Sequence, residues 1–170
     1  MSNSRILSLS AAVVVLLVGA SIPVAMAAFH LPGSPNDCVR EQLNVRSNGE
    51  SGALGTIHGA WVFENRSNDA CTLQGYPDLQ MFRKGGRPLP TTTKHTLAPS
   101  TRHVELDPGE SATFFSSYSD VEMGSEKCRT SRVLEITAPD AGAGLFVPAR
   151  LMACGGVIRV SAVEAGVHSP

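Results

Sequence analysis

Residues 71–77 read Cys-Thr-Leu-Gln-Gly-Tyr-Pro, which places a half-cystine, a turn and an aromatic residue close together in the chain. The cysteine is followed by β-branched Thr72 and apolar Leu73, a composition that is typical of a β-strand. The glycine and the Tyr-Pro pair then interrupt the chain before another strand begins. The stretch therefore predicts a strand end that a disulfide holds on one side and the Tyr76 ring holds on the other.

Apolar and polar residues alternate in short segments along the rest of the chain, and turn-forming residues separate these segments. In one of them, for example, Ile57, Trp61 and Phe63 share the inward face and Val62 points the other way. No helical stripe follows the first residues. The pattern predicts an all-β, immunoglobulin-like antiparallel sandwich of about 7–8 strands. The predicted strands are 42–46, 56–65, 78–83, 102–106, 111–118, 133–137, 145–147 and 157–163.

Three connections between these strands have recognisable composition. A glycine-rich loop is predicted between the first two strands, and a solvated hairpin loop is predicted at 83–87, where two glycines supply positive φ. Residues 107–110 read Asp-Pro-Gly-Glu, a turn with proline at its second position. The longest polar connection is 84–97, which is rich in threonine and proline.

The N-terminus has the organisation of a secretory signal peptide. Arg5 precedes an apolar run over residues 6–18, and Ala25-Met26-Ala27 fits the small-x-small rule for cleavage before Ala28. The alternative is a single membrane anchor, but the run is shorter than the roughly 20 residues that a membrane span needs. We therefore expect a signal peptide at 1–27, a flexible leader at 28–37, a sandwich domain at 38–163 and a flexible tail at 164–170.

The composition of the exported part limits its partners. Removing residues 1–27 from the 170-residue chain leaves 143 residues, which is the size of one domain with a continuous core. The whole chain has 14 lysines and arginines against 15 aspartates and glutamates. Such a balance argues against a nucleic-acid surface. We expect a monomer with no cofactor, no nucleic-acid partner and no membrane anchor after cleavage.

The four cysteines, Cys38, Cys71, Cys128 and Cys154, all follow the predicted cleavage site. An even number of cysteines in an exported chain predicts two disulfides, and four cysteines allow three pairings. A metal site is the alternative. It is disfavoured because the sequence has no Cys-x-x-Cys or Cys-x-x-His pair and because an oxidising compartment favours disulfides.

The 71–77 stretch, together with Asn65 and Ser67 before it, resembles an actinobacterial secreted family, domain of unknown function 4232. The family's pattern is an Asn-x-Ser/Gly turn followed by Cys-Thr-Leu-x-Gly-Tyr-Pro. A second landmark of the family, apolar-x-Pro-Gly-x-x-Ala before an apolar strand, matches residues 106–112. Relatives often have tryptophan late in that strand, where this chain has Tyr118. Some relatives are lipoproteins, whereas no cysteine lies at the cleavage point of this chain.

The resemblance implies a β-sandwich with one disulfide in each half, and it implies no activity, because the family has none assigned. Together with the observation that each pair brackets its own group of strands, it favours Cys38 with Cys71 and Cys128 with Cys154.

Motifs for catalysis or metal binding are missing from the sequence. It has no Gly-x-Ser-x-Gly elbow, phosphate loop or His-Glu-x-x-His helix. His58, His95 and His103 lack metal-site spacing and are expected to be surface imidazoles. Asp120, Glu122 and Glu126 lack the spacing of a calcium loop and predict a solvated loop beside a disulfide. No catalytic, cofactor-binding or metal-binding residue is therefore predicted.

Apolar residues on the outward faces of the strands suggest an interaction patch. The candidates are Val62, Phe82, Phe115 and Phe146; the alternative is that loops cover them or that the sheet is buried on both faces. These features favour a secreted, non-catalytic binding or structural module for another protein or an envelope component. The alternatives are a secreted hydrolase with a loop-assembled site and a protease-inhibitor-like module that presents 84–97.

Overall fold

A computed structural model describes residues 36–96 and 102–170 of the chain. The predicted signal peptide and residues 28–35 of the predicted leader lie outside the described residues. The described part is all-β, as predicted, and its only helical element is the short 3-10 helix η1 (Arg40–Gln42). Within this part, no helix is long and apolar enough to cross a bilayer. The strands are β1 (Leu43–Ala53), β2 (Thr56–Asn65), β3 (Cys71–Leu73), β4 (Asp78–Phe82), β5 (Thr92–His95), β6 (Val104–Leu106), β7 (Ser111–Ser119), β8 (Cys128–Thr130), β9 (Val133–Thr137), β10 (Leu145–Pro148), β11 (Met152–Cys154), β12 (Val157–Val160) and β13 (Glu164–Ala165).

The largest sheet is built on the long strands β2 and β7. Its order is β1-β2-β7-β12-β5, and β13 adds a short second pairing to β7. β2 and β7 are antiparallel, with Trp61 opposite Phe114 and Phe63 opposite Ala112. Because alternate side chains point to the same face, these residues lie together on the buried side of the sheet.

The predicted glycine-rich loop before β2 is instead the end of a hairpin. β1 continues to Ala53 and pairs with β2, with one irregularity between Ser47 and Glu50. The turn is only two residues long, Leu54 and Gly55, and both have positive φ, of 51° and 77°. Two residues with positive φ form a tight turn between antiparallel strands. The glycines of this segment therefore belong to a hairpin and not to an open loop.

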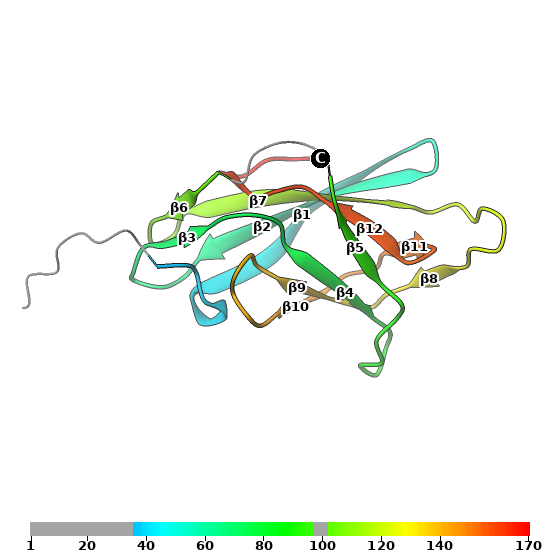
Figure 1. The fold of residues 1–170 in the computed structure, drawn as a ribbon, viewed down its shortest axis with the longest axis horizontal. Coiled ribbons are helices and arrows are strands. Elements are labelled where there is room, and N and C mark those ends of the chain that lie inside the picture. Colours follow the sequence, from blue (N-terminus) through cyan, green and yellow to red (C-terminus); the bar gives the residue numbers. More distant parts are fainter. Residues whose placement is uncertain (1–35, 97–101) are drawn as a thin grey trace, which may run out of the picture. The chain divides into compact units, whose positions relative to one another are not determined.

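The remaining strands lie opposite this sheet (Figure 1). One group has the order β10-β9-β4, and two further pairs are β8 with β11 and β3 with β6. Inward-facing side chains from both sides form one hydrophobic core, so the domain is a β-sandwich as predicted. The largest fully buried side chains in the core are Trp61, Phe63, Leu73, Met81, Leu106, Phe114, Leu134, Ile136, Leu151, Ile158 and Val160.

Both disulfides have the preferred pairing. Cys38 is joined to Cys71 with a sequence separation of 33, and Cys128 is joined to Cys154 with a separation of 26. Each bridge connects neighbouring segments: Cys128 and Cys154 are directly opposite in the β8–β11 pair, and the backbone N–H of Cys38 donates to the carbonyl of Thr72 at 2.8 Å.

The strand count and one pairing differ from the sequence prediction. The described residues contain 13 strands because five short ones, of two to four residues, were not recognised as separate elements. One of these, β5, pairs in parallel with β12. The predicted polar connection 84–97 is therefore not a free loop throughout, since its residues 92–95 are held in the sheet. Alternation over so few residues is too weak to identify a strand.

Residues 164–170, expected to be a flexible tail, include β13 and several specific contacts. Glu164 pairs with Thr113 of β7. The hydroxyl of Thr113 donates to the carbonyl of Gly166 at 2.7 Å and accepts from the backbone N–H of His168 at 3.0 Å. The predicted domain boundary at Val163 therefore falls before the last strand.

Candidate functional site

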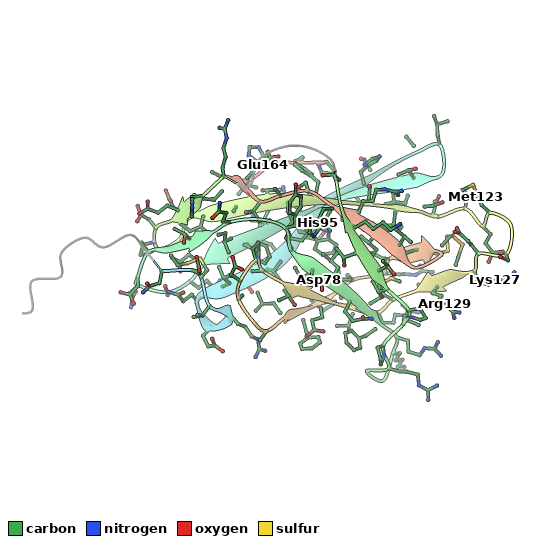
Figure 2. The ribbon with its side chains drawn as sticks, in the orientation of Figure 1. Asp78, His95, Met123, Lys127, Arg129 and Glu164 are labelled. Carbon is green, nitrogen blue, oxygen red and sulfur yellow. A yellow bond between two sulfur atoms is a disulfide. The ribbon has the colours of Figure 1, made fainter. Side chains whose placement is uncertain are left out.

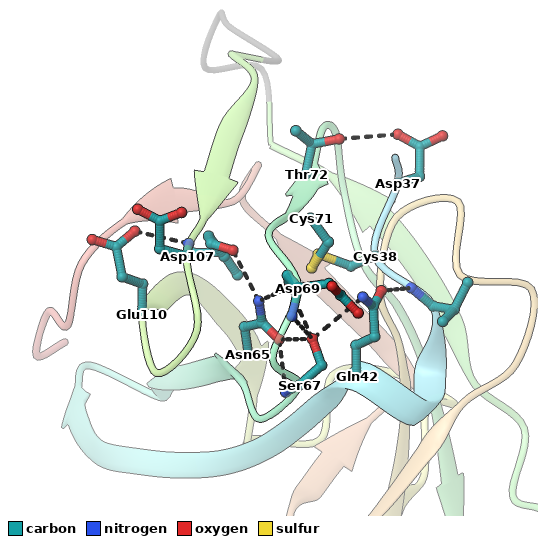
Figure 3. The surroundings of a disulfide bond; sticks show 12 residues. Asp37, Cys38, Gln42, Asn65, Ser67, Asp69, Cys71, Thr72, Asp107 and Glu110 are labelled. Atoms are coloured by element: carbon teal, nitrogen blue, oxygen red, sulfur yellow. Dashed lines mark hydrogen bonds between the residues drawn. A yellow bond between two sulfur atoms is a disulfide. The ribbon is translucent and has the colours of Figure 1, made fainter. Parts of the chain in front are cut away.

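The family's first landmark surrounds a buried asparagine, Asn65, at the end of β2 (Figure 3). Its side-chain amide donates to the carbonyls of Asp69 and Leu106, at 2.8 and 2.9 Å. Its side-chain oxygen accepts from the backbone N–H and the hydroxyl of Ser67, at 3.0 and 2.8 Å. A buried amide is stable only when its donors and acceptors are satisfied, and Asn65 meets this requirement with four hydrogen bonds.

The second landmark is joined to the first at the same residue. The backbone N–H of Asn65 donates to the carbonyl of Glu110 at 2.9 Å, and its carbonyl accepts from the N–H of Gly109 at 2.8 Å. Gly109 has a φ of 85°, so the Asp-Pro-Gly-Glu turn has the positive φ at its third position that a type II turn requires. The two landmarks therefore form one structural unit beside the Cys38–Cys71 disulfide.

The acidic residues before Cys128 lie beside the second disulfide. Glu122 accepts a hydrogen bond from the backbone N–H of Cys128 at 3.2 Å and lies 3.8 Å from the ammonium of Lys127. Glu122 and Glu126 are exposed, and Asp120 is half-buried. Within residues 36–96 and 102–170, no group of three or more histidine, cysteine or acidic side chains could hold a metal ion.

The histidines predicted to be on the surface are exposed. His95 stacks face to face on Tyr76, with ring centroids 4.1 Å apart, so the aromatic ring of the 71–77 stretch does contact another element (Figure 2). His168 contacts the carbonyl of Ala165 at 2.8 Å. In the described part of the chain, no histidine ring hydrogen-bonds a serine hydroxyl, and all four cysteines are in disulfides.

Tyr118, which replaces the tryptophan of some relatives, is almost completely buried. Burial, and then the charges of Glu50 and Asp120, raise the pKa of its hydroxyl from 10.0 to about 12, although a backbone hydrogen bond from Met152 lowers it in part. The phenol therefore stays protonated at any pH at which the protein would work. It acts as an amphipathic core residue, with no sign of an acid or base role.

The four residues of the predicted patch do not form one surface. Val62 is fully buried, so the prediction that it is exposed is wrong. Phe115 is half-buried on β7, in the large sheet. Phe82 and Phe146 lie together on the other side of the sandwich, with ring centroids 5.8 Å apart in an edge-to-face arrangement.

The C-terminal residues account for the burial of Val62. Val62 is directly opposite Thr113, which is also fully buried on the outward face of the large sheet. Thr113 makes its two hydrogen bonds to Gly166 and His168, and the carbonyl of His168 accepts from the amide of Asn48 in β1 at 2.9 Å. The chain end thus crosses the outer face of this sheet at Val62. The alternation of side chains in β2 correctly predicted that Val62 points away from the core. It did not predict that the C-terminal segment covers Val62.

Phe82 and Phe146 belong to an apolar surface on the β4-β9-β10 sheet, in which Phe146 and Pro148 are exposed and Phe82 and Val133 are half-buried. Val133 lies opposite both Phe82 and Pro148, and Phe146 is opposite Glu135. We call Phe82, Val133, Phe146 and Pro148 the apolar face. Phe146 is 58% exposed, which is unusual for so large an apolar side chain in a sheet.

A shallow cleft of about 320 Å³ adjoins the apolar face. Phe146 lines it together with polar side chains, among them Asp78, Gln80 and Glu135. The side-chain amide of Gln80 is already used, since it donates to the carbonyl of Leu89 at 2.7 Å. The cleft thus combines the Phe146 ring with two carboxylates and the guanidinium of Arg40.

These features define a disulfide-stapled β-sandwich whose two sequence landmarks meet at Asn65 beside the first disulfide. The sequence pattern of the family described as Domain of unknown function (DUF4232) matches residues 38–164, and the chain belongs to this family. The resemblance seen in the two landmarks is thereby confirmed. No curated protein and no solved structure matches the chain.

Proposed function

We propose that this protein is an exported, non-catalytic binding module that uses its apolar face to contact a partner protein. One observation carries the proposal. Phe82 and Phe146 are packed against each other on the outer side of a sheet whose inner side is buried in the core. Contiguous apolar surface of this kind marks interaction sites, and aromatic side chains dominate the energy of such contacts.

The scaffold supports this role because it fixes the apolar face rigidly. Leu79, Met81, Leu134 and Ile136 alternate with the outward-facing residues of β4 and β9 and are buried in the core. β10 is a short strand at the edge of its sheet and ends at Pro148. A short edge strand that contains proline resists pairing with another strand, so a partner is expected to bind the side chains of the sheet and not its edge.

The hydrolase alternative has no supporting geometry in the described residues. Its site would need a histidine next to a serine, or a carboxylate pair in a deep cleft. No histidine lines any of the four described clefts. The inhibitor alternative needs an extended free loop, whereas β5 holds residues 92–95 of the 84–97 connection in the sheet. Both observations favour the binding module.

Export is supported by the N-terminal pattern and by the two disulfides, which persist in oxidising compartments. The full chain, expressed in a bacterium that secretes through the general pathway, is expected to appear outside the cytoplasm with Ala28 as its first residue. Intact mass spectrometry with and without thiol alkylation checks this. A retained N-terminus, or alkylation of the cysteines without prior reduction, would contradict the proposal.

The apolar face is tested by removing its two aromatic rings. Phe82→Asp/Phe146→Asp is expected to reduce partner capture from an envelope or culture-medium fraction at least about tenfold, because buried aromatic anchors carry most of the energy of an interface. The measurement is quantitative mass spectrometry after photo-crosslinking from the immobilised mature domain.

Leu54→Asp/Met123→Asp is the control, since it also replaces two apolar side chains by aspartate, at residues that are 106% and 66% exposed and that lie outside the β4-β9-β10 sheet. Thermal melts of both variants check that the fold is retained. Equal capture by the two folded variants would refute a role for the apolar face.

A further inference from the structure

Five cationic side chains meet at one cleft of about 520 Å³. They come from separate parts of the chain: Arg83 and Lys84 follow β4, Arg129 is in β8, Arg132 precedes β9, and Arg150 precedes β11. Figure 1 shows the end of β4 beside β8, and Figure 2 marks Arg129 on β8. The sequence singled out only the 83–87 cluster, because the other three arginines are isolated in the chain and the fold brings them together.

None of these five cations forms an ion pair with a carboxylate, although Arg150 also lines two neighbouring clefts together with Glu50. The described residues form two ion pairs, Arg66 with Glu64 and Lys127 with Glu122, and neither involves the cleft. No carboxylate lines the cleft. Residues 1–35 and 97–101 contain no aspartate or glutamate, so the residues outside the described part cannot supply a carboxylate to the cleft.

This concentration of charge is unusual for the composition of the chain. The protein has 14 lysines and arginines and a net charge of -1, yet five of its cations line one concavity. Like charges that line one cleft repel one another, and a concave surface focuses their field. A polyanion bound in the cleft would relieve this repulsion.

The backbone beneath the cleft is firmly held. The N–H of Arg132 donates to the carbonyl of Phe82 at 2.8 Å, and the N–H of Arg83 donates to the carbonyl of Arg87 at 3.0 Å. Arg129 follows a disulfide-bonded cysteine, and buried Leu89 lies at the base of the cationic side chains. The starting points of the side chains are therefore fixed, and only their outer ends need to be ordered by a ligand.

We propose that this cleft binds a ligand that carries two or more phosphate groups. Four of the five cations are arginines, and the planar guanidinium donates two parallel hydrogen bonds to phosphate oxygens. The volume of the cleft lies within the range of small-molecule sites, and a charge of five cations exceeds what a single phosphate neutralises. The site binds without reacting, and it is separate from the apolar face.

Isothermal titration calorimetry with tripolyphosphate tests this site in the mature protein. The affinity of Arg129→Gln/Arg132→Gln is expected to be weaker by about tenfold or more, because each substitution removes charge-assisted hydrogen bonds. Arg102→Gln/Arg159→Gln is the matched control, since it removes the same net charge from exposed arginines that do not line the cleft, and it should retain the affinity of the unaltered protein.

Two further arms identify the source and the class of the anion. Co-sedimentation with vesicles that contain an isoprenyl diphosphate lipid would assign the phosphates to a lipid headgroup, whereas binding of tripolyphosphate alone would assign them to a free oligophosphate. Citrate is the comparison for carboxylates. Equal affinities of the two double variants, citrate binding as tight as tripolyphosphate, or no binding of either phosphate probe would overturn the proposal. The substitutions leave the apolar face intact, so failure here is distinguishable from failure of the partner-capture experiment.

Discussion

Asn65→Ala is expected to lower the free energy of unfolding by about 3 kcal/mol, a large fraction of the stability of a domain of this size. The substitution removes four hydrogen bonds from a fully buried side chain. Its main cost is the group left behind, since the carbonyl of Leu106 loses its bond to the Asn65 amide in the interior. It also loosens the connection between the two turns that the backbone of Asn65 joins.

Chemical denaturation followed by tryptophan fluorescence measures this loss, because the single tryptophan, Trp61, is buried in β2. Asn68→Ala is the control: it makes the same substitution at an exposed residue of the same turn and should change the stability by less than about 0.5 kcal/mol. Asn65→Asp keeps the acceptor and loses the donors, so it should also destabilise the protein. Equal midpoints for Asn65→Ala and Asn68→Ala would show that Asn65 does not hold the turns together.

Removal of the first disulfide, by Cys38→Ser/Cys71→Ser, is expected to cost about 4 kcal/mol. The loop-entropy relation gives about 3.7 kcal/mol for a bridge between residues separated by 33 positions. Both cysteines are also buried, so their replacement places two hydroxyls in the core. Reducing agent should lower the melting temperature of the unaltered protein in the same direction.

The second disulfide provides the comparison. For its sequence separation of 26 the same relation gives about 3.5 kcal/mol. Loop closure alone therefore predicts that removing either bridge lowers the free energy of unfolding by nearly the same amount. Cys128 is half-buried beside an exposed loop, and Cys128→Ser/Cys154→Ser should therefore cost less than removal of the first bridge. Denaturation of both double variants decides the order. A larger loss for the second bridge would mean that burial around Cys38 and Cys71 adds nothing to loop closure.

The sequence alone was sufficient to predict the class of fold, most of the long strands and both disulfides. Strand prediction succeeded where alternation runs over many residues, as in β2 and β7, because a period of two identifies the buried side directly. It failed for β5 and β8, where so few residues alternate that composition is the only local signal. The disulfides followed from an even cysteine count together with the family pattern.

Only the tertiary structure determined what the surfaces of the molecule present. Alternation correctly placed Val62 opposite the core, but a segment from the far end of the chain buries it. Arg129, Arg132 and Arg150 have no special local pattern, yet long-range strand pairing brings them to the cleft that Arg83 lines. Local sequence encodes the direction of a side chain relative to its own strand, whereas its neighbours across the sheets depend on contacts between distant segments, which a single sequence does not display.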